Sequence, residues 1–145
     1  MDQNRSVPYN NDAEMYVIGS VLLENNIMNS IIGKLNAEDF YNPQNSAIFK
    51  AMLTLFNQSE KIETVSVIEQ LKRDKVANLD DYKNYLIELL DIIPSTSSVG
   101  LYIDVVEEKA VERRILANMQ ELSSDILTSK YDFNSILDRA EDTIL

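Results

Sequence analysis

The apolar residues of this chain recur at spacings of three and four along most of its length. Side chains three and four positions apart share one face of a helix, so this period predicts a succession of amphipathic helices. The chain has only three Gly and three Pro, which favours long helices over sandwiches or barrels. We therefore expect an all-α fold, with helices at about 12–24, 27–32, 43–56, 64–73, 80–93, 98–127 and 133–145.

Short polar motifs at the helix ends sharpen these predictions. Asn11 and Glu14 have the spacing of a capping box at the start of the first helix, and Asp80 and Asp132 are candidate N-caps of the fifth and last helices. Gly19 lies inside the apolar stripe of the first helix, where Gly costs about 1 kcal/mol relative to Ala. Either a close crossing by another helix or a tolerated exposed position explains it.

The first five helices are expected to form a compact head around their apolar faces. Phe40 and Tyr41 are candidate core anchors in the connection before the third helix. The other expected core positions are Val17, Ile18, Val21, Leu22, Leu35, Ile48, Phe49, Met52, Leu53, Phe56, Val67, Ile68, Leu71, Tyr85, Leu86, Leu89 and Leu90.

The helix at 98–127 is the longest in the prediction. At the standard rise, about 30 residues span roughly 45 Å, over twice the usual helix length. A head of this size cannot cover such a helix, so part of it should project and pack on something else. Its apolar face consists of Val105, Leu116, Met119, Leu122 and Ile126, with a gap between the first two.

A short polar turn separates this helix from the last one, which predicts an antiparallel two-helix hairpin. The apolar stripe of the last helix is Phe133, Ile136, Leu137, Ala140 and Ile144. Two helices cover each other too little to bury both stripes, so we expect self-association, contact with a partner's helices, or both. The expected organisation is a flexible arm at 1–10, a head at 11–97 and a hairpin at 98–145. The pattern stops in mid-helix at Leu145, and we expect the chain to be part of something longer.

The composition excludes several kinds of chemistry. Cys and His are both absent, which excludes disulfides and Cys-ligated metals and removes the commonest general base and metal ligand. Where two acidic residues are adjacent on a helix, their side chains point about 100° apart, so they do not act together on one substrate. No P-loop is present. We therefore expect no enzyme activity and no cofactor in this chain, and we interpret its carboxylates as solvated helix faces.

The net charge of the chain limits the kinds of partner it can bind. The net charge is −11, whereas a surface that binds nucleic acid must replace phosphate counterions with Lys and Arg. Two local basic groups, at 72–75 and 109–114, have acidic residues interleaved and are interpreted as solvated faces. No apolar run approaches the length of a signal-peptide core or a membrane span. We expect a cytoplasmic protein that binds neither nucleic acid nor membranes directly.

Several short motifs follow one another in an order that is informative as a whole. They are Pro8, Asn11–Glu14 with Val17–Leu23, Glu38–Tyr41, Ile48–Phe49, Ile62–Glu63 with Val65–Val67, Tyr85–Leu86, Ile93–Ser95, Tyr102–Val106 with Ala110 and Arg113–Arg114, and Ala140–Glu141 with Ile144. From about Pro8 to Leu145, the chain resembles the N-terminal domain of the DnaB-type bacterial replicative DNA helicases. It departs from the family pattern at Asn45, where His is usual, at Asp81–Tyr82, where Gly-Gly is usual, and at Ser98, where Asn is usual.

The resemblance implies a non-catalytic domain for assembly and docking. In the family, hairpins pair between subunits, and three pairs form a collar on a hexameric ring. ATP, Mg²⁺ and the DNA-translocating machinery belong to a separate C-terminal ATPase domain, which this chain lacks. The expected partners are a second copy of the chain, the C-terminal domain of a DnaG-type primase, and a helicase loader.

The resemblance also assigns candidate residues. Primase docking falls on Tyr85, Leu116 and Leu122, for which core or hairpin packing is an alternative explanation. Self-association is expected at Val105, Met119, Ile126, Phe133, Ile136, Leu137 and Ile144. The alternative function is a free-standing helical adaptor with the same fold. A P-loop encoded downstream of residue 145 would favour the helicase, and a stop codon would favour the adaptor.

Overall fold

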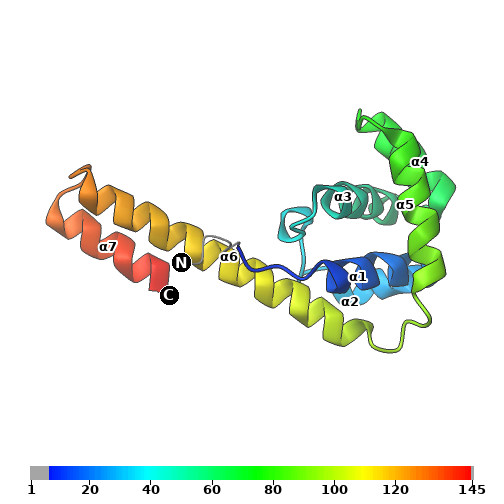
Figure 1. Ribbon diagram of the computed structural model, residues 1–145, viewed down its shortest axis with the longest axis horizontal. Coiled ribbons are helices and arrows are strands. Elements are labelled where there is room, and N and C mark those ends of the chain that lie inside the picture. The colour runs from blue at the N-terminus through cyan, green and yellow to red at the C-terminus, as the bar shows by residue number, and fades with distance from the viewer. Residues whose placement is uncertain (1–6, 145) are drawn as a thin grey trace, which may run out of the picture. The chain divides into compact units, whose positions relative to one another are not determined.

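A computed structural model describes residues 7–144 of the chain, with side chains to residue 143 (Figure 1). The described residues form helices and contain no strand, which confirms the all-α prediction. The α-helices are α1 (Asn11–Leu23), α2 (Met28–Ile31), α3 (Pro43–Asn57), α4 (Thr64–Arg73), α5 (Leu79–Ile92), α6 (Val99–Leu127) and α7 (Phe133–Ile144). Two short 3₁₀ helices are η1 (Asn25–Ile27) and η2 (Ala37–Asp39).

The chain divides into two compact units. The head is Tyr9–Glu108, and the hairpin unit is Lys109–Leu145 together with Met1–Pro8. Helix α6 is continuous and contributes residues to both units. Its first turns supply Ile103 and Val106 to the core of the head. The head was expected to end at residue 97, just before α6. As a compact unit it continues through the first turns of α6 to Glu108.

Four helices, α1, α3, α4 and α5, make up most of the head. Helix α1 packs against α3 and α5, and α4 also packs against α3 and α5. Burying apolar side chains supplies about 25 cal/mol per Å² removed from water, and this is the dominant favourable term in folding. The largest fully buried side chains of the head are Ile18, Met28, Ile31, Ile48, Phe49, Met52, Leu55, Ile62, Leu71, Leu86, Leu89 and Ile103. Most were expected from the helical period.

Gly19 marks a close approach between α1 and the end of α5. A Cβ atom built on Gly19 would overlap Cγ1 of Ile93, closer than real Cβ contacts come. A side chain larger than hydrogen does not fit here without displacement of Ile93. The expectation of a close crossing at Gly19 is confirmed, and the alternative of an exposed Gly is wrong.

Two of the predicted helix caps are wrong and one is confirmed. Helix α1 is capped by Asn10, whose Oδ1 accepts a hydrogen bond from the N–H of Ala13 at 2.9 Å, and no capping box forms between Asn11 and Glu14. Helix α5 starts after Asn78, which has φ of +62°, and not at a cap by Asp80. Asp132 does cap α7, because its Oδ1 accepts from the N–H of Ser135 at 2.9 Å.

Two expected core residues lie at the surface. Tyr41 is exposed and stacks on the ring of Tyr9, with 4.4 Å between the ring centroids. Leu90 is exposed because its neighbour Leu89 takes the buried position on α5. Period alone does not separate a half-buried flank from the centre of a helix face. The second predicted helix also differs, since it divides into η1 and α2 and ends at Ile31, before Gly33 at φ of +88°.

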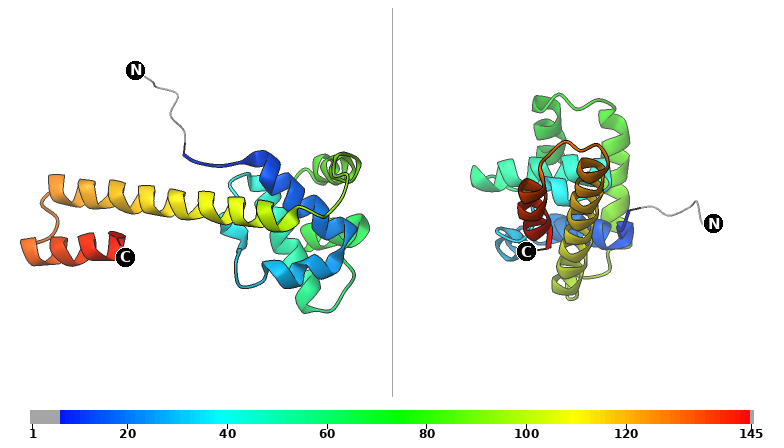
Figure 2. Two further views of the ribbon diagram at one scale, coloured as in Figure 1. Left: turned by 90° about the horizontal axis from the view of Figure 1, so that it is seen from below. Right: turned by 90° about the vertical axis from the view of Figure 1, so that its left-hand side faces the viewer.

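In the hairpin unit, α7 lies antiparallel beside the C-terminal half of α6 in each view (Figures 1 and 2). An ion pair joins the two helices, with 3.5 Å between Asp125 Oδ2 and Arg139 Nη1. Arg113 Nη1 donates to the carbonyl oxygen of Pro8 at 2.9 Å and ties the N-terminal segment to α6. The predicted antiparallel hairpin is therefore present.

Candidate interaction surfaces

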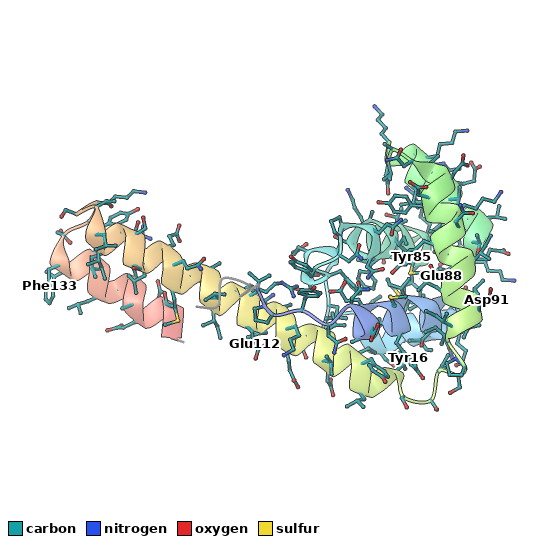
Figure 3. The ribbon with its side chains drawn as sticks, in the orientation of Figure 1. Tyr16, Tyr85, Glu88, Asp91, Glu112 and Phe133 are labelled. Carbon is teal, nitrogen blue, oxygen red and sulfur yellow. The ribbon has the colours of Figure 1, made fainter. Side chains whose placement is uncertain are left out.

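The hairpin unit exposes large apolar side chains on both of its helices. On α6, Met119 is 56% exposed and Ile126 is 53% exposed. On α7, Phe133 is 74% exposed at the start of the helix (Figure 3), and Leu137 is also exposed. Soluble domains rarely leave several large apolar side chains uncovered close together, and such exposure is typical of contact sites.

These side chains lie on the same side of the hairpin. Asp125 on α6 and Arg139 on α7 point toward each other and give a reference direction on each helix. Successive residues are rotated by about 100° around a helix axis, so Ile126 and Met119 point about a third of a turn away from the direction of Asp125. Counted from Arg139 in the same way, at about 100° per residue, Phe133 points about a third of a turn and Leu137 nearly half a turn further round α7. Because the helices are antiparallel, an equal sense of rotation carries both sets to one side. We name Met119, Ile126, Phe133 and Leu137 the apolar face.

The remaining candidates for self-association have different surroundings. Val105 is half-buried against the core of the head, and Ile136 is half-buried in the hairpin. The side chain of Ile144 lies outside the described residues. Of the docking candidates on α6, Leu116 is exposed and Leu122 is half-buried. The expected set therefore separates into exposed members, which are available to a partner, and members that pack within one unit.

Tyr85, the third docking candidate, is fixed by a hydrogen bond inside the head. It points from α5 toward α3 (Figure 3), and its hydroxyl donates to Oδ1 of Asn45 at 2.5 Å. Burial raises the pKa of the Tyr85 phenol to about 12, so the group stays protonated and able to donate at neutral pH. The Tyr85 side chain is half-buried.

Asn45 connects Tyr85 to a buried carboxylate. Asn45 Nδ2 donates to Glu14 Oε1 at 3.1 Å. The same carboxylate accepts from the N–H of Tyr41 at 2.8 Å and from the N–H of Asn42 at 3.2 Å. Three donors satisfy a charge that would otherwise be costly to bury. The interpretation of carboxylates as solvated faces is wrong for Glu14, Asp39 and Asp125, which are all buried.

The described residues were not expected to form a metal site or a membrane span. Among the described residues, no group of three His, Cys, Asp or Glu side chains is arranged to hold a metal ion. No helix in the described part is both long and apolar enough to cross a membrane.

Comparison with protein families gives a match to the family described as "DnaB-like helicase N terminal domain" over residues 6–108. The chain belongs to this family. Its sequence is 30% identical over 141 residues to the replicative DNA helicase DnaB of Geobacillus stearothermophilus, covering 97% of this chain. It is 27% identical over 142 residues to the replicative DNA helicase DnaC of Bacillus subtilis, covering 98% of this chain. The chain spans 31% of the length of each relative.

Solved structures extend the likeness beyond the family match. The N-terminal domain of DnaB helicase from Mycobacterium tuberculosis superposes with a TM-score of 0.88 at 26% identity, covering 96% of this chain and 98% of that one. The family match stops at residue 108, where the head ends, whereas this superposition includes the hairpin unit. The DnaB N-terminal domain is the non-catalytic part of the helicase. The family assignment therefore agrees with the prediction that this chain is not itself an enzyme.

The burial of two carboxylates, those of Glu14 and Asp125, was not predicted from the sequence. Buried Glu14 was hidden because the N-cap is Asn10, one residue earlier than the capping-box spacing suggests. Buried Asp125 was hidden because it lies next to Ile126 on a helix whose charges are otherwise at the surface. The signal available in the sequence was its spacing of three from Leu122, which places both residues on the same face of α6.

Proposed function

We propose that this domain assembles and docks a replicative DNA helicase: hairpins pair between subunits and form a collar on a hexameric ring, and the collar binds the C-terminal domain of a DnaG-type primase. The observation that carries the proposal is the apolar face of the hairpin, which leaves Met119, Ile126, Phe133 and Leu137 uncovered. The family assignment supports a role in DNA replication.

Pairing of two hairpins explains the apolar face better than a stable monomer does. A second copy presents an identical face, so a two-fold axis brings apolar residues of both copies together. Interfaces of this kind owe their energy to a few central apolar side chains that lose contact with water. Val105 packs against the core of the head and Ile136 is half-buried in the hairpin, so we expect each to support its own unit and not to contact the second copy directly.

Disruption of the apolar face tests the pairing. We expect Ile126→Asp with Leu137→Asp to raise the dissociation constant of the dimer at least about tenfold, since two charges would be buried without partners. Val65→Asp is the matched control, because Val65 is 72% exposed but lies on α4 of the head. Sedimentation equilibrium from about 10 µM to about 1 mM covers the relevant affinities. A wild-type chain that stays monomeric throughout would overturn the proposal.

Primase docking has its support in a more distant likeness. A structure described as a DnaB-like replicative helicase and its interactions with primase superposes with a TM-score of 0.75 at 19% identity, covering 92% of this chain. The candidate residues are Tyr85, Leu116 and Leu122. Leu116 is exposed and Tyr85 is half-buried, so both retain surface for a contact, and a helicase loader is proposed as a further partner.

Binding to the primase encoded in the same genome tests this part. We expect Leu116→Asp with Leu122→Asp to weaken binding of the primase C-terminal domain by at least about tenfold, as removal of interface anchors does. Leu127→Asp is the matched control on the same helix, because Leu127 is 81% exposed. Calorimetry gives the affinity and circular dichroism checks the fold. Unchanged affinity in a folded double variant would remove these positions from the docking surface.

The catalytic parts of the helicase are proposed to lie elsewhere. The sequence has no Gly-rich phosphate loop, and we propose that ATP and Mg²⁺ are bound by the C-terminal ATPase domain of the helicase. A net charge of −11 disfavours direct contact of this domain with nucleic acid. Tight, salt-sensitive binding of the domain to single-stranded DNA would contradict that expectation.

A further inference from the structure

A small hollow in the head has two stacked tyrosines in its wall. Tyr16 lies where α1 faces the first turns of α6 (Figure 3), and its ring centroid is 4.3 Å from that of Tyr102. The hollow has a volume of about 190 Å³, and its lining residues all belong to the head. We name it the tyrosine hollow, and it is lined by Asp12, Met15 and Tyr16 from α1, Ile92 and Ile93 from the C-terminal end of α5, and Tyr102 from α6.

The wall of the tyrosine hollow is held in place by the surrounding head. The Tyr16 hydroxyl donates to the carbonyl oxygen of Ser95 at 2.6 Å, and Tyr102 packs against the core of the head. Ile93 is 8% exposed and lies against Gly19. A ligand therefore meets rings that are already ordered, which lowers the entropic cost of binding.

The hollow also presents a carboxylate that a ligand can reach. Asp12 is exposed in the first turn of α1, and it forms no ion pair with a lysine or arginine among residues 7–143. No basic side chain of that same range lies over the ring of Tyr16 or Tyr102. The hollow thus combines aromatic faces, apolar side chains and an accessible negative charge.

We infer that the tyrosine hollow receives an arginine side chain from a basic segment of a partner protein. The guanidinium lies against the tyrosine rings and pairs with Asp12, while the aliphatic stem packs on Met15 and Ile92. The inference goes beyond the proposed function, because the hollow contains none of the residues assigned to hairpin pairing or primase docking.

The hairpin unit shows the same combination of groups holding an arginine. The guanidinium carbon of Arg139 lies 3.8 Å from the centroid of the Tyr131 ring. Its Nη1 is also 3.5 Å from Asp125 Oδ2. A tyrosine face and a carboxylate are therefore sufficient to hold a guanidinium within this chain. The tyrosine hollow offers these two kinds of group to a side chain from outside.

Charge decides between the alternatives for the occupant. Residues 9–108 carry seven basic and sixteen acidic side chains, so the head attracts a basic segment. A second copy of the head carries the same excess and is repelled. A purely apolar side chain would cover Asp12 without compensating its charge. Arginine is favoured over lysine, because a planar guanidinium stacks on aromatic faces and is more weakly hydrated than an ammonium.

The first experiment compares small probes that differ in one property. N-acetyl-arginine amide is titrated at about 1–50 mM into the full ¹⁵N-labelled chain, a range that covers weak single-site binding. Its counterparts are the amides of N-acetyl-citrulline, which is neutral, N-acetyl-leucine, which is apolar, and N-acetyl-lysine. We expect the arginine probe to give saturable NMR shifts at Met15 and Tyr102, with at least about fivefold higher affinity than the citrulline and leucine probes. Equal affinity for any counterpart, or no binding of the arginine probe, would overturn the inference.

Removal of the carboxylate tests the pairing with Asp12. We expect Asp12→Asn to weaken binding of the arginine probe at least about fivefold, and the variant should fold because the residue is exposed. Asp81→Asn is the matched control, since Asp81 is exposed in the first turn of α5 and does not line the hollow. It should change the affinity by less than about twofold. Equal losses in the two variants would show an effect of general charge, and the inference would be wrong.

Removal of an aromatic ring tests the stacking. We expect Tyr102→Leu, which keeps an apolar wall, to weaken binding of the arginine probe at least about fivefold, with the fold checked by circular dichroism. Tyr16→Phe keeps the ring and loses only the hydrogen bond to Ser95, so it should retain affinity within about twofold. Full binding by folded Tyr102→Leu contradicts the inference. If that variant does not fold, the comparison of Asp12→Asn with Asp81→Asn decides.

Discussion

In the head, the large side chains of α3 and α5, such as Phe49, Met52 and Leu86, are inaccessible to solvent, whereas in the hairpin unit Met119, Ile126 and Phe133 are more than half exposed. The two units also treat a buried carboxylate differently. Glu14 in the head accepts hydrogen bonds from three donors, and Asp125 Oδ2 in the hairpin unit accepts none. The Glu14 carboxylate is therefore satisfied within the head, whereas Asp125 Oδ2 depends on its ion pair with Arg139, and the hairpin unit leaves large apolar side chains exposed.

Matched truncations of leucine should separate the two units most strongly. We expect Leu86→Ala, at a fully buried position of the head, to lower the free energy of unfolding by about 3 kcal/mol through lost burial and a residual cavity. Leu137→Ala, at an exposed position of the hairpin, should lower it by less than about 1 kcal/mol in the monomer. Urea unfolding at low protein concentration measures both, because dimerisation would add stability at high concentration. Equal effects would contradict the difference between the units.

The two buried carboxylates allow a second comparison. We expect Glu14→Gln to destabilise the head by about 2 kcal/mol, because an amide NH₂ would face donors that now meet a charged acceptor. Asp125→Asn should lower stability by less than about 1 kcal/mol, since the lost ion pair at 3.5 Å is partly offset by removal of a buried charge. Thermal unfolding followed by circular dichroism gives both values, with exposed Asp12→Asn as the control. A larger effect at Asp125 would show that the hairpin unit depends on this ion pair.

Two helical glycines provide the smallest and most local test of close packing in the head. We expect Gly19→Ala to destabilise by about 1 kcal/mol, because the strain of overpacking against Ile93 exceeds the gain in helix propensity. Gly100→Ala should be neutral or stabilising by up to about 1 kcal/mol, since a Cβ atom there would meet nothing within 4 Å. Adding Ile93→Val to Gly19→Ala should recover part of the loss. Stabilisation by Gly19→Ala alone would show that Ile93 moves aside freely.

The sequence predicted the long helices well because their apolar period is long enough to average over single residues. Helices α3 and α4 begin at Pro43 and Thr64 as expected, and Asp132 caps α7 as predicted. The short elements were predicted less well. A 3₁₀ turn such as η2 carries no period, and its capping by Asn36 and Asp39 is visible only once both residues are placed in space.

The surfaces were harder to predict than the fold, for a physical reason. Periodicity finds an apolar stripe but does not say what covers it, so Val105 and Ile126 looked alike in the sequence. The structure separates them, since Val105 packs against the core of the head and Ile126 is exposed. The role of each exposed residue in pairing or docking remains a prediction, because it depends on a surface that belongs to another molecule.

The contribution of α6 to the core of the head has a consequence for synthesis of the protein on the ribosome. Val106 is the last residue of the core cluster, although the helices that surround the core end at Ile92. We therefore expect the nascent chain to complete the core of the head only after the opening turns of α6 have emerged, and not when α5 does. Until then the surface that receives Ile103 and Val106 stays uncovered, and this interval is where a folding chaperone or a misfolded contact would act.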